Sequence, residues 1–106
     1  MARTLLNVPK TAQRGEVIEV RTLIAHKMDS GFIVDSQGQK VPRDIIQRFT
    51  CRYNGEQVFS ADLFSAIAAN PYIVFYTVAT ESGTLEFEWK GDNGFTQTER
   101  VAIAVT

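Results

Sequence analysis

The sequence predicts an all-β protein, an immunoglobulin-like antiparallel β-sandwich of about seven strands. Three observations support this fold class. The dominant hydrophobic period is two, which is the spacing of β-strands. The apolar runs are short, and turn-forming residues separate them at regular intervals. The 106 residues are 44% apolar and 22% charged, which is the composition of one globular domain spanning residues 1–106. A small β-barrel is the alternative architecture.

The N-terminal half contains the first strands. A turn at residues 12–15 (AQRG) precedes a strand at residues 17–26, where Ile18 and Val20 face one side and Glu19 faces the other. Such alternation is typical of a strand with one face on the core and one in solvent.

Two further strands flank Asn54-Gly55, which is the strongest short hairpin signal in the chain. These strands are expected at residues 45–53 and 58–63. A two-residue turn at this position pairs Tyr53 with Glu56 and therefore Cys51 with Val58.

Only residues 63–70 have helical spacing, and Pro71 limits this helix to at most about two turns. Residues 72–79 (YIVFYTVA) are apolar on both faces, which predicts a central strand covered on both sides. Residues 83–90 and 101–105 alternate again and complete the sandwich.

Charge and cysteine content exclude several classes of protein. The 12 acidic and 11 basic residues give a net charge of −1, so binding to nucleic acid through bulk charge is not expected. One cysteine cannot form a disulfide scaffold. No run of about 20 apolar residues is long enough for a membrane-spanning helix. The first nine residues lack the apolar core of a secretory signal, which leaves a cytoplasmic protein, a processed form or export on a partner.

The residues that could support nucleophilic catalysis or metal binding are few. The only histidine is His26 and the only thiol is Cys51, which shares a strand face with Phe49 and Tyr53 and is expected to be buried and unreactive. A soft-metal site from His26, Met28 and Cys51 has weak support, because its ligands have no repeated spacing.

The carboxylates and glycines also lack a catalytic or phosphate-binding arrangement. Glu86 and Glu88 share a strand face near Lys90, which is typical of a solvated surface. The glycines form no phosphate-binding pattern. We therefore expect no catalytic residue, no cofactor and no metal ion.

A protein-binding surface has more support, because aromatic and arginine side chains are enriched at interfaces. The hairpin register puts Phe59 and Leu63 on the face of the arginines, whereas a β-bulge would return Phe59 to the core, and both alternatives remain open. Pairing through an edge strand is another route. The candidate interface residues are Arg48, Arg52, Phe59, Leu63, Phe64 and Ile67, with Phe32 in a polar loop as a second candidate. On this basis Phe59→Asp or Leu63→Asp should weaken partner binding without unfolding the sandwich.

Several segments together carry a resemblance to a known family. They are LLNVPK at residues 5–10, RGEVIE at 14–19, LIAH at 23–26, PRDII at 42–46, YNGE at 53–56, FSADLF at 59–64, AANPY at 68–72, FYTVATESGTL at 75–85 and WKGDNG at 89–94. With these segments the chain resembles the Z subunit of the bacterial Sox thiosulfate-oxidation system over essentially its whole length.

The resemblance implies an immunoglobulin-like sandwich that forms a heterodimer with a Y subunit, and it leaves open whether this heterodimer doubles. The Y subunit carries the sulfur substrate on the cysteine of a C-terminal Gly-Gly-Cys-Gly-Gly arm. This chain has no such arm, so the resemblance implies a non-catalytic SoxYZ-type carrier subunit that makes transient contacts with the pathway enzymes. It also implies a periplasmic location, reached by export with a signal-bearing partner. Two other hypotheses remain, an independent ligand- or metal-binding module and an enzyme that uses His26 and Cys51.

Overall fold

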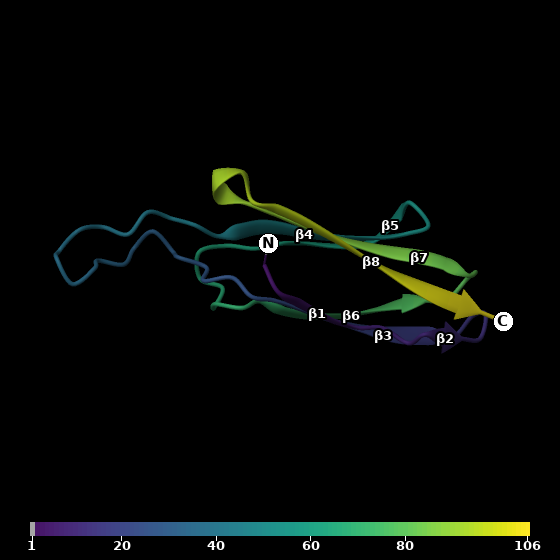
Figure 1. The fold of residues 1–106 in the computed structure, drawn as a ribbon. Coiled ribbons are helices and arrows are strands. Elements are labelled where there is room, and N and C mark those ends of the chain that lie inside the picture. The colour runs from purple at the N-terminus through teal and green to yellow at the C-terminus, as the bar shows by residue number, and fades with distance from the viewer. Residues whose placement is uncertain (1) are drawn as a thin grey trace.

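The computed structural model describes residues 2–106, in which eight strands form two stacked sheets (Figure 1). The three-stranded sheet has the order β1-β3-β6. Its strands are β1 (Thr4–Asn7), β3 (Val17–Ile24) and β6 (Tyr72–Val78). The five-stranded sheet has the order β2-β8-β7-β4-β5. Its strands are β2 (Thr11–Ala12), β8 (Thr96–Val105), β7 (Gly83–Gly91), β4 (Ile46–Tyr53) and β5 (Glu56–Asp62).

These two layers confirm the predicted β-sandwich. Every pairing is antiparallel except that of β2 with β8. A short 3₁₀ turn, η1 (Asp92–Gly94), joins β7 to β8. Within the described residues no helix is long and apolar enough to cross a membrane.

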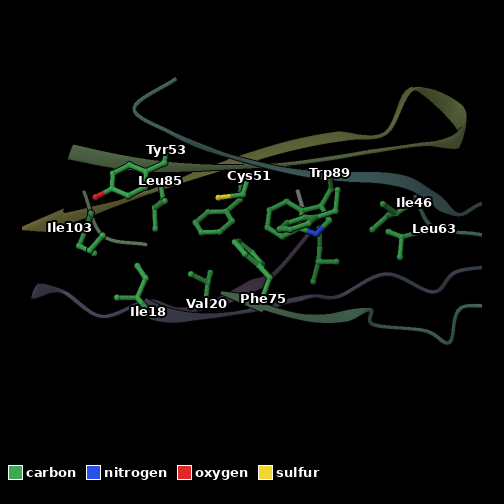
Figure 2. Close-up of a cluster of buried hydrophobic side chains, with 14 of the residues drawn as sticks. Ile18, Val20, Ile46, Cys51, Tyr53, Leu63, Phe75, Leu85, Trp89 and Ile103 are labelled. Carbon is green, nitrogen blue, oxygen red and sulfur yellow. The ribbon is translucent and has the colours of Figure 1, made fainter. Parts of the chain in front are cut away.

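The core lies between the sheets, where alternate side chains of each strand point inward (Figure 2). On β3 the predicted alternation is confirmed, because Ile18 and Val20 are buried while Val17 is exposed. On β7, Leu85, Phe87 and Trp89 are buried in the same way. The hydrophobic core therefore uses one face of each sheet, as the period of two requires.

Aromatic side chains join the sheets at the centre of this core. The Phe49 ring centroid lies 5.2 Å from that of Trp89 and 6.2 Å from that of Phe87, within the five-stranded sheet. It also lies 6.1 Å from the ring of Phe75 in the opposite sheet. Phe59 stacks on Phe75 at 4.4 Å with an interplanar angle of 8°. This contact between β5 and β6 closes the sandwich along that edge.

A β-bulge changes the predicted hairpin register. Tyr53 pairs with Glu56 as expected, and the turn residues Asn54 and Gly55 have the positive φ angles of 50° and 85° that a tight hairpin requires. Between Cys51 and Arg52 the register shifts, so that Cys51 pairs with Phe59 and not with Val58. The predicted Cys51–Val58 pairing is wrong and the bulge alternative is confirmed. Phe59 therefore faces the core, because β5 carries one extra residue.

Two further predictions fail around Pro71. Residues 63–70 form turns and not a helix, because the Asn70 amide donates to the His26 carbonyl oxygen at 2.7 Å and Asn70 has a φ of 56°. Strand β6 is an edge strand with one covered face, so its predicted two-sided burial is wrong. Phe75 is 4% exposed, whereas its neighbour Tyr76 is 61% exposed.

The bulge predicts a large loss of stability for a charge at Phe59 and almost none for the same change at the exposed Phe64. Phe59→Asp should lower the free energy of unfolding by at least about 2 kcal/mol, because it inserts a carboxylate beside the rings of Phe75 and Phe49. Phe64→Asp is the matched control and should change it by no more than about 0.5 kcal/mol, because Phe64 is 67% exposed. Urea unfolding followed by tryptophan fluorescence measures both values, and equal stabilities would contradict the observed register.

Candidate partner interface

The outer face of the five-stranded sheet is charged, and it holds two of the predicted interface residues. The Arg48 guanidinium lies 2.8 Å from the Asp62 carboxylate. The Arg52 guanidinium lies 3.4 Å from Glu86 and 3.6 Å from Glu88. Each of these arginines therefore has an acidic neighbour, and such partly exposed pairs contribute little to stability. This face has the alternating charges of a solvated sheet surface.

Two other predicted interface residues belong to the core. Phe59 stacks on Phe75, and Leu63 is only 7% exposed. Their predicted place beside Arg48 and Arg52 is wrong, because the bulge turns Phe59 and the residues that alternate with it, Ala61 and Leu63, toward the interior. A carboxylate at either position would disturb the sandwich itself, which overturns the expected folded state of those variants.

The remaining three candidates are exposed near one end of the sandwich. Phe32 is 80% exposed, Phe64 is 67% exposed and Ile67 is 37% exposed. Phe32 and Phe64 line the same hollow, which has a volume of about 670 Å³ and a floor that includes Leu63 and Ile45. We call Phe32, Phe64 and this hollow the arm surface. An exposed aromatic pair around a hollow is typical of a protein-binding site.

Phe32 is carried by a long arm, residues 25–45, that projects beyond the sheets (Figure 1). Its two limbs are joined near the base by hydrogen bonds of 2.9 and 2.8 Å between Asp29 and Asp44. Further out, the Val41 amide donates to the Ile33 carbonyl oxygen at 2.8 Å. Ile33 and Val34 are 53% and 60% exposed, so the outer part of the arm presents apolar side chains to solvent.

Asp92 of η1 fixes the base of the arm. Its carboxylate accepts hydrogen bonds from the Arg43 guanidinium at 2.8 and 2.9 Å, from the Ile45 amide at 3.1 Å and from the Gln47 side chain. The Arg43 guanidinium is the largest cause that lowers the pKa of Asp92 below its ordinary value. Arg43 and Asp92 are 49 residues apart, so no local sequence pattern predicts this clamp.

His26 and Met28 have structural roles at the same base. The Met28 amide donates to His26 Nδ1 at 3.0 Å, and the imidazole packs edge-on against Phe95 at 5.1 Å. The Ile46 amide donates to Met28 Sδ at 3.2 Å. Among the described residues, no group of three or more His, Cys, Asp or Glu side chains is placed to hold a metal ion.

Cys51 lies in the middle of β4, between Phe59 on β5 and Phe87 on β7. Its side chain is fully buried, as predicted, and desolvation raises the pKa of the thiol to about 12. The thiol is therefore protonated at neutral pH and has no access to a substrate.

Comparisons with known proteins give one family and a set of similar folds. The sequence profile described as "Sulphur oxidation protein SoxZ" matches residues 6–102. No curated protein matches the chain in sequence.

The similar solved structures share the fold at low identity. A superoxide reductase (neelaredoxin) from Ignicoccus hospitalis has 13% identity and a TM-score of 0.77, covering 99% of this chain and 82% of its own. The sulfur carrier protein SoxY from Chlorobium limicola f thiosulfatophilum has 11% identity and a TM-score of 0.67, covering 97% of this chain and 78% of its own. The CARDB domain of a Pyrococcus furiosus protein, solved with di-metal ions, has 11% identity and a TM-score of 0.57, covering 100% of this chain and 94% of its own. These structures support the sandwich architecture alone.

The buried thiol gives the first prediction for this region. Folded protein should react with a maleimide or an aromatic disulfide at pH 8 at least about 100-fold more slowly than urea-unfolded protein, because only the exposed thiolate is nucleophilic. Thiol titration with and without urea measures the two rates. Rapid modification of the folded chain would contradict the buried position of Cys51.

The arm clamp gives a pH-dependent prediction. The pKa of Asp92 is lowered in the folded state from an ordinary value of 3.8, so its contribution to stability is present above that pH and is lost as the pH falls through the lower folded value. Asp92→Asn should therefore be less stable than the parent chain at pH 6, and the difference should shrink toward pH 2.5. Thermal unfolding across this range measures the difference in stability between the two proteins. A difference that does not change with pH would contradict a clamp that depends on the charge of Asp92.

Proposed function

Because the chain belongs to the family of the sulphur oxidation protein SoxZ, we propose that it is the non-catalytic subunit of a heterodimeric SoxYZ-type sulfur carrier in thiosulfate oxidation. In this proposal, its partner is a SoxY-type subunit that holds the sulfur substrate on a cysteine near its C-terminus. This chain stabilises and presents that partner to the enzymes of the pathway, in the periplasm, after export together with it.

The observation that carries this proposal is the inert state of the chain's one cysteine. A sulfur carrier needs an accessible thiol that forms a thiolate, whereas Cys51 is buried and burial raises its pKa to about 12. We therefore assign the covalent step to the partner chain. A SoxZ family member with an inaccessible thiol suits the role of the partner that the carrier subunit binds.

The arm surface is the place where we propose that the SoxY-type subunit binds. Phe32 and Phe64 provide two exposed rings around a hollow of about 670 Å³, and aromatic anchors in such hollows dominate many interfaces. The clamp between Arg43 and Asp92 fixes the base of the arm before binding, which reduces the loss of conformational entropy on association.

This proposal predicts that the arm surface controls partner affinity. Phe64→Asp and Phe32→Asp should each weaken binding to the SoxY-type subunit by at least about tenfold, because truncated anchors commonly cost about 2 kcal/mol or more. Isothermal titration calorimetry with the purified partner measures the dissociation constants.

Thr98→Asp provides a matched control for the added charge. Thr98 is an exposed residue of β8, remote in sequence from the arm, so its variant should bind like the parent chain. Circular dichroism confirms that each variant is folded. Parent-like affinity for both phenylalanine variants would remove the arm surface as the binding site, and a chain that ignores the SoxY-type subunit altogether would overturn the proposed function.

A further inference from the structure

The outer face of the three-stranded sheet is apolar over most of its length, unlike the charged outer face of the other sheet. On β6 the outward residues Tyr72, Val74, Tyr76 and Val78 are 58%, 39%, 61% and 45% exposed. On β3, Val17 is 63% exposed. No element among residues 2–106 covers them, because β1, β3 and β6 form the outer layer (Figure 1). We call the outward side chains of β3 and β6 the three-stranded face.

One polar cluster interrupts this face at its centre. Glu19 accepts hydrogen bonds from the Arg21 guanidinium and from the Tyr76 hydroxyl, the latter at 2.9 Å. The strand register pairs Val20 with Phe75 in the row between these residues. Charged side chains therefore lie on either side of one central row, with apolar residues beyond them toward both ends.

The order of residues along both strands makes this face complementary to itself. A second copy can be rotated by 180° about an axis that lies between the two faces and crosses the strands over the Val20–Phe75 row. On β3, this rotation brings Glu19 of each copy opposite Arg21 of the other.

The same rotation matches the side chains of β6 by size. Tyr76 of one copy comes opposite Val74 of the other, and Tyr72 comes opposite Val78. Large side chains therefore meet small ones, as the interior of two packed sheets requires. A two-fold axis along β3 would instead oppose Glu19 to Glu19 and Arg21 to Arg21, and would place β6 of one copy over β1 of the other.

From this double match we infer that the three-stranded face binds a second copy of this chain in a two-fold symmetric dimer. Opposite charges near the axis fix the orientation, because like charges held together across an interface oppose association. Apolar residues on both sides of the charged centre provide the area removed from water. The inference depends on β3 and β6 alone and is independent of the SoxY-type partner.

The size of the face sets the expected strength of the dimer. Seven residues of β6 extend over about 20 Å, and the two strands β3 and β6 span about 10 Å, so the footprint is well below the roughly 800 Å² per partner of a standard interface. We therefore expect reversible association with a dissociation constant above about 10 μM.

A charge-exchange experiment tests both the face and the orientation. Sedimentation equilibrium of the isolated full chain should show a monomer–dimer equilibrium, and Glu19→Arg or Arg21→Glu alone should weaken it by at least about tenfold, since like charges then meet twice. An equimolar mixture of these two variants should dimerise within about threefold of the parent chain, because every facing pair is again opposite in charge.

Control variants that change the net charge by the same amount separate the effect of the facing ion pairs from general electrostatic attraction between the chains. Glu88→Arg and Arg48→Glu, on the outer face of the five-stranded sheet, should each dimerise like the parent chain, alone and mixed. Val78→Asp disrupts the apolar end of the face, where Val78 pairs with Val17 and not with Glu19 or Arg21, and should also yield monomers. Thermal unfolding verifies that each variant is folded.

Three results would overturn the inference. The first is a parent chain that remains monomeric at the highest soluble concentration. The second is a single variant, Glu19→Arg or Arg21→Glu, that dimerises normally. The third is an equimolar mixture of the two variants that does not dimerise. If, in addition, Val78→Asp weakened the complex with the SoxY-type subunit, this face would belong to that partner. Such a result would leave the proposed carrier role intact.

Discussion

The stacking of Phe59 on Phe75 is the contact on which the shape of this protein depends. Phe59 belongs to an edge strand of the larger sheet and Phe75 to an edge strand of the smaller sheet, so their contact closes the core along one side. Phe59 can reach Phe75 only because the bulge beside Cys51 shifts β5 by one residue. Without that shift, the apolar side chains of β5 would lie among the arginines and carboxylates of the outer face.

The strands could be predicted from the sequence, whereas the register between β4 and β5 and the contacts across the sandwich could not. Alternation in residues 17–26 and 83–90 reports which face of a strand is buried, and that depends on the strand alone. A bulge depends on the packing of Phe59 across the sandwich, for which neighbouring residues provide no signal. The expected helix at residues 63–70 failed for a similar reason, since the amide of Asn70 bonds to His26, 44 residues away.

The candidate interface was predicted in part. Phe32, Phe64 and Ile67 are exposed, and their contact with a partner stays a prediction. Phe59 and Leu63 were misplaced through the register. Arg48 and Arg52 lie on the outer face as expected, but they neighbour carboxylates and not an apolar patch. Residues 72–79 are apolar on both faces, although only one face of β6 is covered within the chain. Apolar residues on both faces indicate two covered faces, but a second protein molecule can cover one of them.

The two uncovered apolar surfaces lie on different parts of the chain, which has consequences for assembly. The arm surface uses residues 25–45 and the loop after β5, whereas the three-stranded face uses β3 and β6, so the two surfaces share no residue. The arm projects roughly along the strands (Figure 1). A two-fold axis across the strands would therefore direct the two arms to opposite ends of a dimer. Carrier subunits bound to those arms would be held apart, and each could present its cysteine without steric competition from the other.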